Sequence, residues 1–348
     1  MSTTALSGYC RGALLAVFGV LACSGPVRAA TATATEAPNL DNPIVLQRAD
    51  PWIHRDEASG CYTFIGTVPE FDRIELRRAC RLNDFKLAEP VVVWRKRESG
   101  PMSANIWAPE LHRIDGVWYI YFAAGDVEKR FSIRMYALSN PHADPLSGEW
   151  KEEGQIVTHL DSFALDATSF EHRGKRYLAW AQQDAQRSYN SALWIAEMDT
   201  PVSIRQPVTL LSEPTLDWEI QGYKVNEGAA VIVRNGRVFM TYSASATDER
   251  YAMGLLWADE GADLLDPQSW RKSPDPVFIT DETLGRYGPG HNSFVLAEDG
   301  ETDLMIYHAR DYRELQGTPL TDPNRHARAR VLYWDEQGFP DFRQTMGD

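Results

Sequence analysis

VNEGAAVIVRNGRVFMTYS, residues 225–243, places two short runs of apolar residues on either side of an Asn-Gly pair. Asn235-Gly236 between such runs is a strong signal for a two-residue turn, so the stretch predicts a β-hairpin. A carboxylate, Glu227, stands immediately before the first strand. The stretch therefore predicts a hairpin with an acidic side chain at its open end.

The same pattern occurs four more times along the chain. The turn glycines are 56, 58, 62 and 64 residues apart, and they are Gly60, Gly116, Gly174, Gly236 and Gly300. Each step is long enough for a four-stranded antiparallel sheet with its loops and too long for a helical repeat. The repeat predicts an all-β fold, a five-bladed β-propeller with a central funnel.

In each copy, one residue before the first strand lies a nearly constant number of residues ahead of an aromatic or apolar residue in the second strand. Counting back 12 residues from that second-strand residue gives Asp50, Trp107, Glu227 and Asn292, and counting back 11 gives Asp166. Each acid alone could be a strand-end cap or a hydrogen-bonded structural group. Three like charges around one axis are costly unless a function uses them, so together they predict an active site.

Composition favours one large β domain, residues 43–348. The chain has 348 residues, of which 43% are hydrophobic and 11% aromatic, and no break in composition follows residue 43. The net charge of −14 makes nucleic acids and anionic membranes unsuitable partners. We expect a monomer.

Residues 1–29 have the features of a secretory signal peptide. Arg11 precedes a short apolar run, and Val27-Arg28-Ala29 is a small-residue cleavage site. The run is too short to span a membrane, so we expect no transmembrane helix. Residues 30–42 follow as a leader, and the mature chain is expected to be secreted or periplasmic. Lipoprotein anchoring at Cys23 is the alternative.

Two cysteines lie outside the signal. Pairing the strands on either side of residues 68–73 brings Cys61 opposite Cys80. The cysteines can form a cross-strand disulfide in an oxidising compartment, or they can remain a reduced pair.

Five motifs, RADPW, IWAPELH, FALDATSF, VNEGAAV and YGPGHNSF, carry a resemblance to a known family. The set resembles family 43 of the glycoside hydrolases, five-bladed propellers that remove arabinofuranose or xylose from plant polysaccharides. The chain is most similar to the α-L-arabinofuranosidases of that family. The resemblance implies that plant cell-wall arabinan or arabinoxylan oligosaccharides are the partners.

The resemblance also implies roles for the three acids in an inverting reaction. Asp50 would be the general base, Glu227 the general acid, and Asp166 the carboxylate that orients the acid and raises its pKa. An inverting glycosidase needs one ionised and one protonated carboxyl group. No cofactor is required for this chemistry.

Three further residues are expected at the substrate. Trp107 would form an apolar wall for the sugar or pack between blades, and Arg325 would grip the sugar hydroxyls unless a neighbouring arginine does so. His291 is expected at the channel, where relatives hold water or calcium, so a structural calcium ion near His291 is a further expectation.

Other activities stay open on the sequence alone. A β-xylosidase or an endo-arabinanase would use the same acids, and a non-catalytic propeller would bind sugar without cleaving it.

The loop after Asp311, ELQGTPLTDPNRH, has no counterpart in the other copies. We expect it to shape the pocket rim and thereby the choice between exo and endo action.

Overall fold

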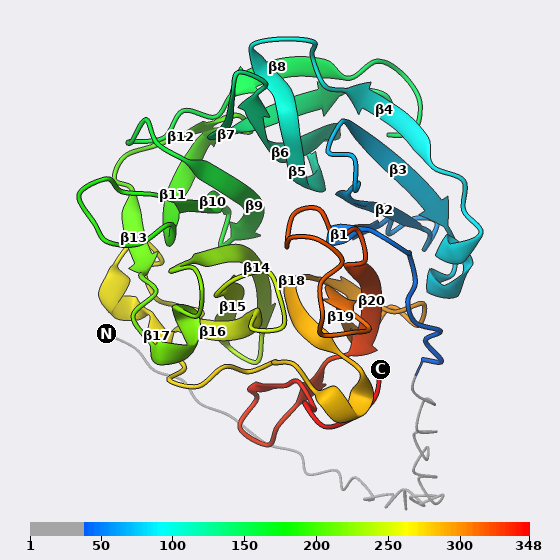
Figure 1. The fold of residues 1–348 in the computed structure, drawn as a ribbon, viewed down its shortest axis with the longest axis vertical. Coiled ribbons are helices and arrows are strands. Elements are labelled where there is room, and N and C mark those ends of the chain that lie inside the picture. Colours follow the sequence, from blue (N-terminus) through cyan, green and yellow to red (C-terminus); the bar gives the residue numbers. More distant parts are fainter. Residues whose placement is uncertain (1–37) are drawn as a thin grey trace, which may run out of the picture. The chain divides into compact units, whose positions relative to one another are not determined.

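Five antiparallel sheets surround a central axis in the computed structural model, which describes residues 38–348 (Figure 1). The expected signal peptide, Cys23 and the leader up to residue 37 lie outside the described residues. The all-β, five-bladed propeller predicted from the repeat is confirmed. Helical structure in the described part is limited to four short 3-10 segments, η1 (Leu82–Lys86), η2 (Asp217–Glu219), η3 (Pro267–Ser269) and η4 (Glu282–Leu284).

Each blade is a meander whose first strand lies nearest the axis. The first two blades contain β1 (Ala49–Arg55), β2 (Tyr62–Thr67), β3 (Arg73–Ala79) and β4 (Val91–Arg95), then β5 (Pro101–Ile114), β6 (Val117–Asp126), β7 (Lys129–Asn140) and β8 (Lys151–Gln155). The third contains β9 (Ala164–His172), β10 (Lys175–Gln182), β11 (Ala192–Thr200), β12 (Ser203–Ile204) and β13 (Thr209–Ser212). The fourth contains β14 (Asn226–Arg234), β15 (Arg237–Ala244), β16 (Ala252–Asp259) and β17 (Arg271–Lys272), and the fifth β18 (Tyr287–Leu296), β19 (Asp303–Arg310) and β20 (His326–Val331), followed by the small pair β21 (Tyr333–Trp334) and β22 (Pro340–Asp341).

The fifth sheet has three strands of its own and is completed by residues from the start of the domain. Ile44 N–H donates to the Ala327 carbonyl at 2.9 Å, and Ala327 N–H donates to the Val45 carbonyl at 2.9 Å. The Asn42 side chain adds two bonds to the backbone of Ala329, at 2.7 and 2.8 Å. Because these bonds join the two ends of the propeller, they close the ring and cover an edge that would otherwise expose unpaired backbone groups.

A β-bulge interrupts every innermost strand at the same level. In the fourth blade Glu227 pairs with Ser243, and the next pair is Ala230 with Thr241. The inserted residue nearest the strand start has a left-handed backbone in each blade, and the five are Asp50, Ala108, Asp166, Gly228 and His291, with φ between 43° and 58°. Non-glycine residues rarely adopt this conformation, and its recurrence is typical of a functional site.

The pairing of the strands shows which residues occupy equivalent positions, and these differ from the residues found by counting along the sequence. Asp50 and Asp166 are equivalent to Gly228 and to His291, whereas Glu227 lies one residue earlier, level with Trp107. Counting along the sequence therefore misplaced Glu227 by one residue relative to the other two acids. The count failed because it treated offsets of 11 and 12 residues as one position, although the hairpin turns differ in length: the turn between Arg55 and Tyr62 is longer than the turn between Arg234 and Arg237.

Apolar faces of neighbouring sheets form the core. Five clusters of buried side chains fill the spaces between adjacent blades, and one of them joins Ile195 of blade three to Val238 and Met240 of blade four. The close packing holds the inner ends of the blades in fixed positions around the axis.

In the described part of the chain, no helix is long and apolar enough to cross a membrane.

Cys61 and Cys80 form a disulfide in the first blade. The register that pairs Tyr62 with Ala79 brings them together, as the sequence predicts. The bridge closes a loop with a sequence separation of 19 residues, for which the chain-entropy model gives about 3 kcal/mol of stabilisation.

We expect a reducing agent to lower the free energy of unfolding by about 3 kcal/mol, measured by urea denaturation. The double variant Cys61→Ser, Cys80→Ser should have the stability of the reduced protein and should not respond to reductant. Equal stability of the oxidised and reduced proteins would contradict the prediction.

Candidate active site

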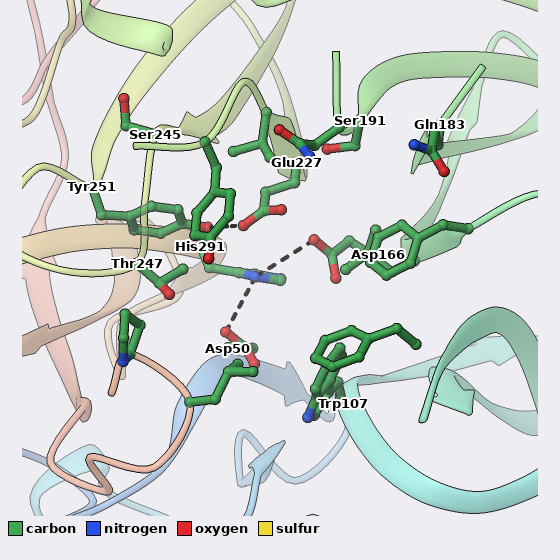
Figure 2. Close-up of a pocket in the computed structure, with 18 of the residues that line it drawn as sticks. Asp50, Trp107, Asp166, Gln183, Ser191, Glu227, Ser245, Thr247, Tyr251 and His291 are labelled. Carbon is green, nitrogen blue, oxygen red and sulfur yellow. Dashed lines mark hydrogen bonds and ion pairs between the residues drawn. The ribbon is translucent and has the colours of Figure 1, made fainter. Parts of the chain in front are cut away.

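The starts of the five innermost strands surround one pocket of about 400 Å³ (Figure 2). All six residues singled out on the sequence line it, and they are Asp50, Trp107, Asp166, Glu227, His291 and Arg325. These residues come from all five blades, so a single cavity unites positions that are up to 275 residues apart. The volume suits one or two sugar rings.

Asp50 is held as an ionised carboxylate. Its Oδ2 accepts the Thr67 hydroxyl at 2.6 Å, and its Oδ1 lies 3.4 Å from the Arg325 guanidinium and 3.2 Å from His291 Nδ1. Burial opposes ionisation, but the charges of His291 and Arg325 and the Thr67 hydroxyl outweigh it and lower the pKa of Asp50 to about 2. A carboxylate in this state can accept a proton from water.

The pKa of Glu227 is shifted in the opposite direction from that of Asp50. Its Oε1 accepts the Tyr251 hydroxyl at 2.9 Å. Burial, and then the negative charge of Asp50, raise the pKa of Glu227 to about 7, although the Tyr251 bond acts in the other direction. A carboxyl group with this pKa holds its proton in mildly acidic solution and can donate it.

Asp166 lies beside this pair and joins blades three and four. Its Oδ2 accepts the N–H of Gly228 at 3.0 Å, directly after Glu227 in the chain. Burial, followed by the charges of Glu227 and Asp50, raises the pKa of Asp166 well above its usual value. Because Asp166 and Glu227 repel each other when both are ionised, the pair retains a proton more readily than either carboxyl group would alone.

Two histidines border Asp50. Asp50 N–H donates to His308 Nδ1 at 3.0 Å, and burial lowers the pKa of His308 well below its usual value. The 3.5 Å approach of His308 Nδ1 to the Asp50 carboxylate is therefore not an ion pair, because that nitrogen carries no proton. His291 Nδ1 lies between Asp50 and Asp166, at 3.2 and 3.9 Å (Figure 2).

Backbone amides at the bulges bind side chains of the preceding blade. The amide of Ala108 donates to Thr67 Oγ1 at 2.7 Å, and that of His291 donates to Ser243 Oγ at 2.8 Å. Asp50 bonded to His308 and Gly228 bonded to Asp166 repeat the arrangement. These contacts couple the position of each carboxylate to the neighbouring blade and make the site rigid.

Trp107 and Arg325 both line the pocket. The Trp107 ring lines the pocket and packs edge-on against Phe71, with ring centroids 5.8 Å apart. One ring therefore both forms a wall of the pocket and packs against its neighbour. Arg325 reaches Asp50, whereas Arg310 pairs with Asp322. Arg328 and Arg330 also pair away from the pocket, both with Asp348.

The loops between second and third strands supply pocket residues that the sequence analysis missed. They include Gln183, Asn190, Ser191, Ser245, Thr247 and Tyr251. In an up-and-down blade, this loop lies at the same end of the sheet as the start of the first strand. The strand pattern therefore contained the signal for the third and fourth blades, where residues before the third strand line the pocket.

The loop from residue 311 to residue 325 covers one side of the pocket with Thr318, Pro319 and Leu320. Buried Asp322 anchors it by accepting the Tyr312 hydroxyl at 2.8 Å and the Gln316 N–H at 2.8 Å. Its position at the rim agrees with the expectation from the sequence. A closed side of this kind restricts how a polymer chain can cross the pocket.

Within residues 38–348, no three His, Cys, Asp or Glu side chains converge in a way that would hold a metal ion. The carboxylates of Asp50 and Asp166 both lie within 4 Å of His291 Nδ1. The calcium ion expected near His291 stays a prediction.

A five-bladed propeller with an ionised and a protonated carboxyl group in one sugar-sized pocket has the architecture of a glycoside hydrolase. The family model described as glycosyl hydrolases family 43 matches residues 40–340. The chain belongs to this family, as its motifs indicated.

Several relatives are similar over most of the chain. An extracellular exo-α-(1→5)-L-arabinofuranosidase of Streptomyces avermitilis is 49% identical over 97% of this chain and 69% of its own length. The enzyme of the same description from Streptomyces chartreusis is 50% identical over 86% of this chain and 92% of its own. The crystal structure of an α-L-arabinofuranosidase from Lactobacillus brevis superimposes with a TM-score of 0.86 at 49% identity, covering 90% of this chain and 99% of that one.

Proposed function

We propose that this glycoside hydrolase is an inverting, exo-acting α-L-arabinofuranosidase that removes terminal arabinofuranose from arabinan or arabinoxylan oligosaccharides. The observation that carries the proposal is the pairing of Asp50, whose pKa is lowered to about 2, with Glu227, whose pKa is raised to about 7, in one pocket. The pair has the two protonation states that inversion requires at the same pH.

In the proposed reaction, Asp50 removes a proton from a water molecule as the water attacks the anomeric carbon. Glu227 gives its proton to the departing glycosidic oxygen from the other side of the sugar. Asp166 holds the strand that carries Glu227 and keeps the shared proton on the pair. Both proton transfers are made by side chains, so the reaction needs no cofactor, and each transfer is worth about 10² to 10⁴ in rate.

Two features support the choice of substrate and mode of action. The two Streptomyces relatives, 49% and 50% identical to this chain, carry the names of exo-acting arabinofuranosidases. The loop that holds Leu320 closes one side of the pocket, which suits a chain end better than the middle of a polymer. Arg325 and Trp107 would then contact the terminal sugar, with the guanidinium on its hydroxyls and the indole on its apolar face.

The test compares 4-nitrophenyl α-L-arabinofuranoside with 4-nitrophenyl β-D-xyloside, and linear arabinan with its oligosaccharides. We expect turnover of the arabinoside, release of arabinose alone from arabinan, and proton NMR signals of the β-anomer as the first product. Preference for the xyloside would indicate a β-xylosidase, and release of oligosaccharides an endo-arabinanase. Binding without any release would indicate a non-catalytic propeller.

The pKa values predict the pH dependence of kcat/KM. Glu227 is active while protonated, below its raised pKa, and Asp50 is active while ionised, above its lowered pKa. We therefore expect kcat/KM on the arabinoside to fall as the pH rises through about 7 and to show no acidic limb above about pH 4. An alkaline limb near the usual pKa of a glutamate would contradict the assignment of the acid.

We also propose that the protein is exported. The signal-like residues 1–29 and the Cys61–Cys80 disulfide suit an oxidising compartment outside the cytoplasm. The two Streptomyces relatives are named as extracellular. Detection of the protein in the periplasm or medium of its source, with residues 1–29 removed, would test this.

A further inference from the structure

Tyr251 connects the carboxylates of the site although no sequence motif marked it. It lies in the loop between β15 and β16, and its side chain is 1% exposed. The hydroxyl donates to Oε1 of Glu227 at 2.9 Å (Figure 2). The ring stacks on His308 with centroids 5.8 Å apart and planes 5° from parallel, so the phenol has little freedom to rotate.

The surroundings of Tyr251 are shaped to hold it. A Cβ at Gly290 would lie 2.4 Å from Tyr251 Cε1, so the absence of a side chain there makes room for the ring. His308, which stacks on the ring, is fixed by the N–H of Asp50 at 3.0 Å. One stacked pair therefore supports the backbone of the base through His308 and the carboxyl group of the acid through Tyr251.

We propose that Tyr251 is a positioning residue for the catalytic acid: its hydroxyl holds Oε1 of Glu227 and leaves Oε2 to carry the proton to the departing oxygen. The inference rests on the proposed function, in which Glu227 is the acid. Among residues 38–348, Tyr251 is the one side chain that donates a hydrogen bond to this carboxyl group. Without it, the carboxyl group would rotate about its last bond and spend less time in the orientation for proton transfer.

The same hydrogen bond lowers the pKa of Glu227, as the charge of Arg325 also does, and so acts against burial and the charge of Asp50. Burial and the charge of Asp50 raise the pKa of Glu227, while the Tyr251 hydroxyl stabilises the ionised form and lowers it. Burial keeps the pKa of Tyr251 itself well above 10, so it remains a donor. The other titratable and charged groups around the site come from β1, β9, β18, β19 and the segment before β20, and they are Asp50, Asp166, His291, His308 and Arg325.

The test compares Tyr251→Phe with Tyr62→Phe. Tyr62 is equally buried, and its hydroxyl donates to the Leu296 carbonyl away from the pocket, at 3.0 Å. We expect Tyr251→Phe to move the alkaline limb of kcat/KM upward by about one pH unit. We also expect kcat on an arabinan disaccharide to fall about 10-fold with little change in KM, and a smaller loss on the 4-nitrophenyl arabinoside, which needs less acid assistance.

Tyr62→Phe should keep the wild-type pH profile and the wild-type ratio of activities on the two substrates. If Tyr251→Phe behaves like Tyr62→Phe, or loses the same factor on both substrates with an unmoved alkaline limb, the inference is overturned.

A second variant avoids any loss of packing. Incorporation of 3-fluorotyrosine at position 251 makes the phenol a stronger donor with nearly the same shape, so the alkaline limb should move downward. A limb that does not move, or moves upward, would overturn the inference. If Glu227→Gln leaves the alkaline limb and disaccharide turnover intact, the proposed function itself fails. If Glu227 behaves as the acid while both Tyr251 variants match wild type, the positioning role alone fails.

Discussion

Asp50→Asn is expected to lower kcat/KM on arabinofuranosides by about 10³ to 10⁴-fold. An amide cannot take the proton from the attacking water, whereas the Asp50 carboxylate, with its pKa lowered to about 2, is ionised in neutral and mildly acidic solution. Asparagine tolerates the left-handed backbone of this position, with φ 52°, better than alanine does, so the variant should fold. Steady-state kinetics on 4-nitrophenyl α-L-arabinofuranoside provide the measurement.

Azide and a distant carboxylate supply the controls for Asp50→Asn. Azide attacks without losing a proton, so it should restore turnover in the variant and form a β-arabinosyl azide. Asp303→Asn removes an equally buried carboxylate that pairs with Arg234 at 2.8 Å, outside the pocket. It should reduce stability and leave kcat/KM unchanged. More than a tenth of the wild-type activity in Asp50→Asn would exclude Asp50 as the base.

Glu227→Gln is expected to have an effect that depends on the leaving group. Turnover of an arabinan disaccharide should fall by about 10³-fold, because a sugar alkoxide leaves slowly without a proton. The loss on the 4-nitrophenyl arabinoside should be far smaller, because nitrophenolate is a stable anion. The alkaline limb near pH 7 should disappear, since the group that titrates there is gone. Kinetics on both substrates between about pH 4 and pH 9 would show this.

Glu75→Gln serves as the matched control. Glu75 is buried in the first blade, where Arg48 Nε donates to it at 3.0 Å and Arg73 Nε at 3.1 Å, and it does not line the pocket. The variant should be less stable and keep both the pH profile and the ratio of activities on the two substrates. An equal loss on both substrates in Glu227→Gln would show that Glu227 binds the sugar rather than donating a proton.

Local pattern was sufficient to predict the blades and the location of their acids. Each hairpin brings together residues that are close in the chain, so the turns at Gly116 and Gly236 and the alternation around them could be recognised without tertiary information. The cross-strand position of Cys61 and Cys80 followed from the same local counting. Asp50 and Asp166 were found because they recur with the repeat.

Local counting failed where hairpin turns differ in length and where distant strands are joined. The turn between Arg55 and Tyr62 is longer than the turn between Arg234 and Arg237, so a fixed offset placed Glu227 level with Asp50 although it lies one residue earlier. The closing bonds between residues 44–45 and Ala327 link opposite ends of the domain. The strand pattern places Tyr251 just before a third strand, but its hydrogen bond to Glu227 exists only when the two segments pack together.

The sequence by itself determined the five sheets, their order and the presence of carboxylates at one end of the propeller. It could do so because the formation of each hairpin depends on residues that are close together in the chain. The tertiary structure alone decided the chemistry of those carboxylates. Asp50 is ionised because Arg325, Thr67 and His291 come to it from other segments, and Glu227 is protonated because closure of the ring buries it near Asp50. Two acids of nearly equal intrinsic strength thus become a base and an acid through charges and burial that only the closed propeller creates.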